Sequence, residues 1–313
     1  MRTIFDYWRQ YVRDEWNARY AAVMAPFLLL LLGLNYGLGL DDRLMALRST
    51  GWLHFLLSLA YYGVPYYFAA LSYAWAYGRF DLLGRHGFWV TSGLALAAYA
   101  VYSGNVGTDW VTTIVPADLR AYALRCAANV LPALLGLGSL LLLWLIVDRR
   151  QSGFFGLFGG TFHPTPYVGF LALGLPIVVA ASFSPDFLAT YPRYPYSPAL
   201  LRHGIAPWQA FALFQICYGA DYVFTELFFR GLLVVGMARW IDQAAIMPMV
   251  AWYMVIHFGK PVGEAMASIV GGWALGVIAY RTRSVLGGVL FHLGVAWAME
   301  LSAMWQKSIG ILH

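Results

Sequence analysis

The chain has 313 residues, of which 61% are hydrophobic and only 11% are charged, with a net charge of +5. About a quarter of the residues are charged in a soluble globular domain, so this composition excludes such a domain and predicts a polytopic membrane protein. The basic residues lie at the ends of apolar segments, where they contact anionic lipid headgroups, so we expect the lipid bilayer as a partner and no nucleic acid.

The first eighteen residues predict a helix that lies in the headgroup layer. Phe5, Trp8, Val12 and Trp16 recur at helical spacing, and polar residues occupy the other side of the helix. The uninterrupted apolar core and the small-residue cleavage site of a signal peptide are missing. We therefore expect residues 1–18 to form an interfacial amphipathic helix that stays attached.

The rest of the chain consists of apolar segments and short loops. We predict an all-α fold, a polytopic helical membrane protein with about eight or nine hydrophobic segments. The segment at 246–258 is too short to cross alone and is expected to be a half-span or to extend into its neighbours. The expected segments are 19–40, 52–77, 87–104, 122–147, 166–184, 208–237, 246–258, 263–280 and 285–306.

The location follows from these segments and from the charges between them. A small excess of Lys and Arg on the side of the N-terminus favours a cytoplasmic N-terminus. We expect an integral membrane protein of a bacterial inner membrane in this orientation. The two cysteines, Cys126 and Cys217, fall within predicted spans without CxxC spacing, and we interpret both as small packing residues.

Ionisable side chains inside the apolar segments are concentrated in the last third of the chain. Burying each in a membrane costs about 2.5–3.5 kcal/mol, so each is a candidate functional residue. Their distribution predicts a transmembrane scaffold at 19–207 and a core carrying the site at 208–313. The candidates are Asp221, Glu226, Arg230, His257 and His292, with Glu264 and Glu300 as weaker ones.

Glu226 and Arg230 are four residues apart, so they share a helix face and can form a charge-assisted pair. Desolvation raises the pKa of the Glu226 carboxyl, and the positive charge of Arg230 lowers it. The carboxyl is thereby left able to take a proton near neutral pH. An ion pair that only fixes helix packing is the alternative. His257 and His292 are each the lone polar side chain of an apolar stretch, and alone each would be a hydrogen-bonded core residue. Together with a carboxylate on three successive helices, they indicate a site.

Glycine and serine form a stripe between the two histidines. Ser268, Gly272 and Gly276 recur every four residues. Such a stripe lets another helix approach closely, so we predict a tight helix contact there rather than a catalytic role.

Three motifs in this region, at about residues 208 to 300, resemble those of the CPBP group of intramembrane proteases, also called the type II CAAX prenyl endopeptidase or Abi group. "TELFFRG" resembles the family's E-E-x-x-x-R helix, "YMVIH" its F-x-x-x-H motif, and "HLGVA" its third motif, H-x-x-x-N or H-x-x-x-A. Tyr253 takes the place of the phenylalanine in the second motif. The resemblance implies a helical membrane core and peptide hydrolysis by a glutamate-activated water with two histidines.

The sequence departs from this family pattern at two positions. Thr225 stands where the family has its first glutamate, and Ala296 stands where some members have asparagine. The resemblance implies that the first glutamate is the general base of the family, and this position is Thr225 here. We therefore expect Glu226, the carboxylate that remains in the motif, to serve as general base, with Arg230 as its orienting partner. His257 and His292 would hold the water or stabilise the oxyanion. Asp221, on the face of Thr225, is the alternative base.

A metal site is a second interpretation of the same residues, because two histidines and one glutamate make a sound zinc ligand set. The close HExxH ligand spacing typical of catalytic zinc helices does not occur in the sequence. We therefore expect no metal and no other cofactor. Bound zinc and the effect of a chelator would separate the two interpretations.

Three classes of function remain open from the sequence. The favoured one is an intramembrane glutamic-type endopeptidase that hydrolyses a membrane-tethered protein or peptide, either lipidated or C-terminally anchored. The second is a catalytically inactive relative that binds such substrates or scaffolds a complex. The third is an unrelated proton-coupled transporter, although we find no internal repeat of the kind that transporters show. The substrate, the cleavage site and the oligomeric state are not determined by the sequence.

Overall fold

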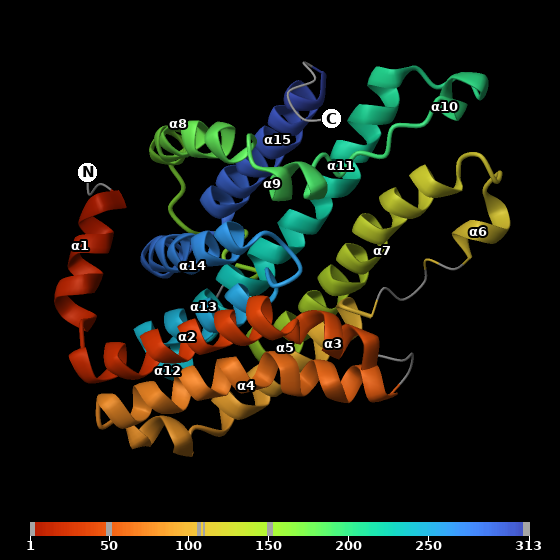
Figure 1. Ribbon diagram of the computed structural model, residues 1–313. Helices are drawn as coiled ribbons and strands as arrows, with labels where there is room; N and C mark the ends of the chain where they lie inside the picture. Colours follow the sequence, from red (N-terminus) through yellow and green to blue (C-terminus); the bar gives the residue numbers. More distant parts are fainter. Residues whose placement is uncertain (1–3, 48–51, 105–107, 109, 149–152, 309–313) are drawn as a thin grey trace. The chain divides into compact units, whose positions relative to one another are not determined.

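The computed structural model describes residues 4–47, 52–104, 108, 110–148 and 153–308, and the regular elements in these ranges are all helices (Figure 1). This confirms the predicted all-α polytopic membrane fold. Seven helical stretches of the described residues are long and apolar enough to cross a membrane: Ala18–Leu38, Trp52–Ala76, Arg120–Val147, Pro164–Ala181, Pro207–Val255, Val262–Thr282 and Leu286–Ser308.

This count is slightly below the expected eight or nine segments, for two reasons. The segment expected at 87–104 forms a helix of only 17 residues. The segments expected at 208–237 and 246–258 belong to one continuous helical stretch, Pro207–Val255.

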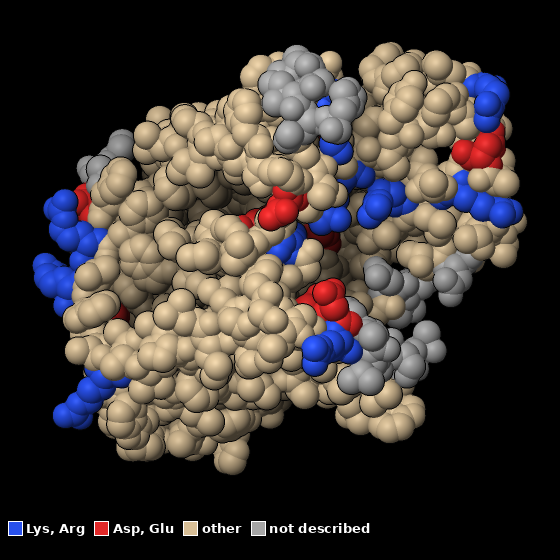
Figure 2. Space-filling model, viewed as in Figure 1, with Lys and Arg blue, Asp and Glu red and all other residues tan. Residues whose placement is uncertain are grey.

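The helices follow one another through short connections. In chain order they are α1 (Ile4–Glu15), α2 (Ala18–Leu38), α3 (Leu40–Leu47), α4 (Trp52–Ala76), η1 (Phe80–Gly84), α5 (His86–Tyr102), α6 (Val111–Ile114), α7 (Arg120–Leu143), η2 (Trp144–Asp148), α8 (Pro164–Ala181), α9 (Pro185–Thr190), α10 (Ala199–Arg202), α11 (Pro207–Glu226), η3 (Leu227–Gly236), α12 (Ala238–Ile241), η4 (Asp242–Ala245), α13 (Ile246–Val255), α14 (Val262–Thr282) and α15 (Leu286–Ser308). On the face drawn in Figure 2, most atoms belong to uncharged residues.

The chain divides into two compact units, each made of several stretches of sequence. Unit 1 comprises residues 1–104, 139–162 and 226–286, and unit 2 comprises residues 105–138, 163–225 and 287–313. The predicted division into a scaffold at 19–207 and a core at 208–313 concerns function and stays a prediction. Glu226, Arg230, Tyr253 and His257 belong to unit 1.

The core of unit 1 surrounds Trp252 of α13. This side chain is fully buried, and α13 as a whole is buried along nearly its entire length. Ten residues are too short to cross a bilayer, so α13 is an internal helix that other helices cover. The rings that contact Trp252 come from α4, α5 and η3; they are Tyr62, Tyr66, Tyr99, Phe228 and Phe229.

Helix α14 packs against α13 through the predicted glycine stripe. A side chain at Gly272 would meet the ring of Tyr253 at 3.1 Å, and one at Gly276 would meet the Sδ-bound methyl of Met249 at 2.8 Å. These short distances show that α14 approaches α13 closely at both glycines, so the predicted close helix contact is confirmed. The stripe thereby fixes α13, which precedes His257.

Helix α1 packs on α14 through one edge of its apolar face. The indole N–H of Trp8 donates to the carbonyl of Ala274 (3.0 Å), and its ring contacts Trp273. Phe5 and Trp16, which the sequence places on the same apolar face, are exposed. The expected position of residues 1–18 in the headgroup layer stays a prediction.

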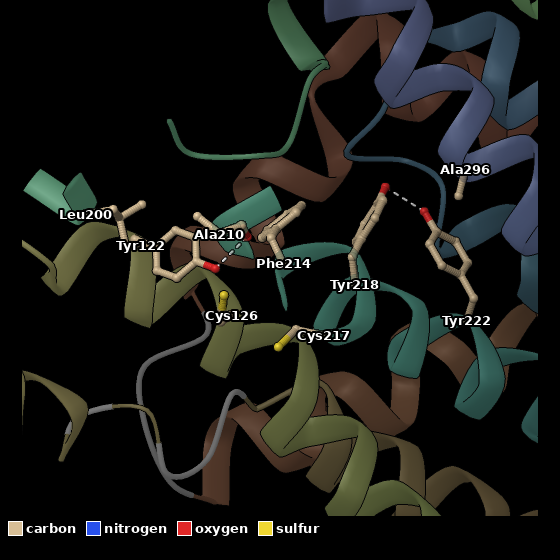
Figure 3. Close-up of a cluster of buried hydrophobic side chains, with 9 residues drawn as sticks. All are labelled: Tyr122, Cys126, Leu200, Ala210, Phe214, Cys217, Tyr218, Tyr222 and Ala296. Carbon is tan, nitrogen blue, oxygen red and sulfur yellow. Dashed lines mark hydrogen bonds between the residues drawn. The ribbon is translucent and has the colours of Figure 1, made fainter. Parts of the chain in front are cut away.

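Unit 2 is built around a cluster of buried side chains from α7, α10, α11 and α15 (Figure 3). Glu300 of α15 is fully buried, and its carboxylate accepts backbone N–H groups of Arg193 and Tyr194, the latter at 3.1 Å. Glu300 therefore anchors the segment before α10. At the surface, His203 and Arg202 beside Asp118 hold the pKa of that carboxyl below its ordinary value.

Candidate active site

The predicted pair of Glu226 and Arg230 forms inside unit 1. Arg230 Nη1 donates to Glu226 Oε1 at 2.8 Å, and both side chains are essentially inaccessible, at 0% and 1% exposure. Glu226 is the last residue of α11, and Arg230 lies in η3, a helix of π type. Because the pair is shielded from water, the attraction between the two charges is strong and each depends on the other.

Two glycines explain how η3 can be buried on all sides. A side chain at Gly231 would meet the carbonyl oxygen of Phe155 at 2.8 Å, and one at Gly236 would meet the Phe155 ring at 3.0 Å. The segment around Phe155, itself 1% exposed, thus lies directly against the helix backbone. The π geometry was not predicted from the sequence. π-helical turns are rare and are found frequently at functional sites.

Tyr253 connects the ion pair to the first histidine. The guanidinium carbon of Arg230 lies 4.1 Å from the centroid of the Tyr253 ring, which is a cation–π distance. The same ring packs edge-on against the imidazole of His257, with centroids 4.7 Å apart. The aromatic position of the second motif therefore has a structural role here, since it holds Arg230 on one side and His257 on the other.

His257 lies in the turn that follows α13 and is 6% exposed. Its Nδ1 is 2.8 Å from the backbone carbonyl of Tyr253. A carbonyl oxygen only accepts hydrogen bonds, so Nδ1 carries the proton in the neutral ring and Nε2 presents the lone pair. This backbone contact sets both the tautomer and the orientation of the imidazole.

Helix α2 holds the turn that carries His257. The side-chain amide of Asn35 donates to the carbonyl of Phe258 (3.0 Å), and its oxygen accepts the backbone N–H of Asp41 (3.0 Å). The hydroxyl of Tyr36 donates to the carbonyl of Lys260 at 2.8 Å. The contacts with Phe258 and Lys260 join residues more than two hundred positions apart.

Asn35 and Tyr36 were missed by the sequence reasoning, which examined only ionisable side chains within the spans. A usable signal was present, because Asn35 is an amide inside the apolar run at 19–40. A buried amide must find hydrogen-bond partners, and in a membrane helix these are on another segment.

Glu264, a weaker candidate, has a different environment. Its carboxylate accepts from Lys260 Nζ at 2.5 Å, and both side chains are partly exposed, at 18% and 23%. This carboxylate neutralises a lysine at the end of the turn, so it serves as a comparison for the buried Glu226.

Four predicted residues belong to unit 2. The ring of His292 packs against Tyr222 with centroids 4.5 Å apart, and the Tyr222 hydroxyl donates to Tyr218 (2.6 Å). Ala296 is 1% exposed within the buried cluster of this unit. The roles of these residues toward Glu226 stay predictions.

The remaining two are on α11, ahead of Glu226. Thr225 is buried and directly precedes Glu226, whereas Asp221 is half-buried. At about 100° per residue, Asp221 lies roughly 140° around the helix from Glu226. The two carboxylates therefore occupy different faces of α11.

The metal interpretation requires several ligand side chains to lie close together. No group of three or more His, Cys, Asp or Glu side chains is arranged to hold a metal ion in the part of the chain that the structure describes. Measurement of bound zinc in the purified protein remains the direct test.

Comparison with known proteins adds one finding. Residues 207–298 match the family described as type II CAAX prenyl endopeptidase Rce1-like. All three motifs, from Thr225 to Ala296, lie inside this match. Searches of curated proteins and of solved structures gave no significant match. Over residues 207–298, under a third of its length, the chain is thus similar to the type II CAAX prenyl endopeptidase Rce1-like family, in agreement with the resemblance of its three motifs.

Proposed function

We propose that the protein is an intramembrane glutamic-type endopeptidase that hydrolyses a peptide bond in a membrane-tethered protein, with Glu226 as the general base. The observation that carries the proposal is the buried chain of contacts from Glu226 through Arg230 and Tyr253 to His257. The family match of residues 207–298 supports the reaction class.

In the proposed mechanism Glu226 takes a proton from a water molecule while the oxygen of that water attacks the scissile carbonyl. The C–O bond forms and negative charge develops on the carbonyl oxygen. When this intermediate collapses, the C–N bond breaks and the carboxyl returns the proton to the leaving amine. Arg230 fixes the orientation of the buried carboxyl group through its hydrogen bond. No cofactor is part of this proposal.

The two histidines hold the attacking water or stabilise the oxyanion in this mechanism. His257 is oriented by its backbone contact, so its Nε2 accepts a hydrogen bond when neutral and donates one when protonated. A donor aimed at the developing negative charge contributes about 10²–10³-fold in rate. His292 is retained as the second histidine on the basis of the third motif.

A specific observation favours a second candidate, a catalytically inactive relative that binds membrane-tethered proteins. The first glutamate of the family motif is replaced by Thr225, and Ala296, at the asparagine position, is buried among hydrophobic side chains. If the base were the missing glutamate, the site would retain binding and lose hydrolysis.

Reconstitution of the purified protein into lipid vesicles with membrane-anchored peptides separates the two candidates. The peptides comprise a prenylated C-terminal CAAX peptide and single-span peptides, and products are identified by mass spectrometry. Cleavage by the unmodified protein is expected, with a loss of about 10²–10⁴-fold in Glu226→Gln and His257→Ala.

Glu264→Gln is the matched control, because it removes a carboxylate of the same unit that is paired and partly exposed. It should leave cleavage unchanged. Binding of the peptides without cleavage by the unmodified protein would support the inactive relative. Cleavage retained by Glu226→Gln would refute the proposed base, and stoichiometric zinc with loss of activity after chelation would refute the metal-free mechanism.

A further inference from the structure

The spanning helices of unit 1 have two opposite ends, and these ends differ in charge. One end, which we call the arginine end, comprises the last turns of α1, α4 and α14, the first turn of α2, and the short segments η1, α12 and η4. The other, which we call the turn end, comprises the last turn of α2, the first turns of α3 and α14, and the turn that carries His257.

Hydrogen bonds join the segments of the arginine end. Glu15, the last residue of α1, accepts from the side-chain amide of Gln243 at 2.6 Å, and Arg281 of α14 donates to the oxygen of the same amide at 3.1 Å. The side-chain amide of Asn17, at the start of α2, donates to the carbonyl of Ala76, the last residue of α4, at 3.2 Å. These contacts place the four helix ends at one side of the unit.

The two ends carry very different numbers of basic side chains. Among the residues that the structure describes, the arginine end has seven basic and four acidic residues, and the turn end has two basic and three acidic residues. On the face drawn in Figure 2, basic side chains gather at the edge where Figure 1 shows α1. The residues of the arginine end are Arg13, Arg19, Arg79, Arg85, Arg239, Arg281 and Arg283, with Asp14, Glu15, Asp81 and Asp242; those of the turn end are Arg43 and Lys260, with Asp41, Asp42 and Glu264.

This difference determines how unit 1 is inserted in a membrane. Cytoplasmic loops of membrane proteins carry an excess of Lys and Arg, and Asp and Glu contribute little to orientation. We propose that the arginine end faces the cytoplasm, and that Glu226 and His257 lie in the non-cytoplasmic half of the membrane, where they act on exported proteins held by a single span. The substrate class rests on the proposed function, whereas the orientation does not.

Helix α14 provides a scale for the depth of the site. It runs from the turn end to the arginine end over 21 residues, which is about 31 Å. Its Gly272 lies ten residues from each end of the helix, and the ring of Tyr253 packs against this glycine. The cation–π contact between Arg230 and Tyr253 therefore lies near the middle of the span.

Glu226 and His257 lie between this middle level and the turn end. Helix α13 is antiparallel to α14, because its Met249 packs against Gly276, which is nearer the arginine end. His257, which follows α13, is therefore displaced from the middle towards the turn end. Glu226 precedes Arg230 by one turn, while η3 continues from Arg230 towards the arginine end, so Glu226 is displaced in the same direction.

A site at this depth selects among membrane-tethered chains. A protein lipidated in the cytoplasm has its modified end at the cytoplasmic face, on the far side of the span from His257. An exported protein held by a C-terminal span leaves the membrane at the non-cytoplasmic face, so the bonds near that end of its span reach the level of the site. The orientation thus favours the C-terminally anchored substrate over the lipidated one.

Cysteine labelling in oriented membrane vesicles tests the orientation independently of activity. Leu83→Cys places a thiol on η1 at the arginine end, and Asp42→Cys places one on α3 at the turn end, both at exposed positions. A membrane-impermeant maleimide should label Asp42→Cys in right-side-out vesicles and Leu83→Cys in inverted vesicles. The unmodified chain is the control, because both of its cysteines are buried.

Phe80→Cys and Val262→Cys form a second pair, at 58% and 46% exposure, so a variant that misfolds does not remove the test. Phe80→Cys belongs to the arginine end and Val262→Cys to the turn end. Labelling of the arginine-end cysteines in right-side-out vesicles, or equal labelling in both kinds of vesicle, would overturn the proposed orientation.

Two single-span reporters, each co-expressed with the protein, test the substrate class. Both carry the same library of randomised flanking peptides, in one on the non-cytoplasmic side of the span and in the other on the cytoplasmic side. We expect cleavage of the first reporter alone, and none with Glu226→Gln. Cleavage of the second reporter would overturn the substrate class. Cleavage of neither, with labelling as expected, would overturn the proposed hydrolysis and the substrate class while supporting the orientation.

Discussion

Replacing Arg230 by methionine tests whether the buried ion pair is the central element of unit 1. Methionine keeps most of the volume of the side chain and removes the charge, so the main consequence is that Glu226, at 0% exposure, loses its counter-charge. Removing one partner of a buried pair costs about 3–5 kcal/mol. Loss of the guanidinium–ring contact with Tyr253 adds up to about 2 kcal/mol. We expect the free energy of unfolding to fall by at least about 3 kcal/mol, which is more than a hundredfold in the folded-to-unfolded ratio.

The assay is equilibrium unfolding in mixed detergent, with thermal melting as a second measurement. Arg202→Met is the matched control, because Arg202 pairs with Asp118 at 3.2 Å but is 68% exposed. An exposed pair is worth about 0–1 kcal/mol, so this variant should unfold almost as the unmodified protein does.

A double variant separates charge from packing. In Glu226→Gln with Arg230→Met neither charge remains, so most of the lost stability should return. The reasoning would be refuted if Arg230→Met cost no more than Arg202→Met. A double variant as unstable as Arg230→Met would show that packing, rather than the unpaired carboxylate, causes the loss.

Three further predictions concern the neighbours of the site. Asn35→Leu should destabilise the protein by about 1–3 kcal/mol and speed amide hydrogen exchange in the turn 256–260, because it leaves two buried backbone groups without their partner; unchanged exchange would contradict this. Tyr253→Phe should retain most of the cleavage and stability, since it keeps the ring that lies against the guanidinium and the imidazole, whereas Tyr253→Leu should lower both in the same assays; equal losses would assign the role to the hydroxyl. Asp221→Asn should reduce cleavage only modestly while Glu226→Gln abolishes it, and the reverse order would make Asp221 the base.

Several features of the site followed from local sequence. The spacing of Glu226 and Arg230 predicted their pairing, because two charges one turn apart inside lipid are far more stable together than apart. The aromatic residue four before His257 was predicted only by its place in the motif, and its contacts with Arg230 and His257 were found in the structure. Patterns of this kind are predictable because they depend on residues within one or two helical turns.

Other features depend on partners that sequence spacing does not reveal. Asn35 lies in a span that was predicted to be scaffold, yet it holds the turn of His257 from more than two hundred residues away. The burial of Cys126 and Cys217 in one cluster likewise requires α7 and α11 to be neighbours. The spacing of residues along the chain does not show which helices will be neighbours.

The sequence by itself determined that the chain is an all-helical membrane protein and that its ionisable side chains collect in the last third, because both follow from the cost of polar groups in lipid. Through three short motifs it also indicated the family whose model matches residues 207–298. Only the tertiary structure decided that α13 is an internal helix, that η3 is of π type, and that Asn35 and Tyr36 hold the turn of His257. The physical reason is that these features depend on packing and hydrogen bonds between distant segments of the chain. Such partners are fixed only when the helices pack.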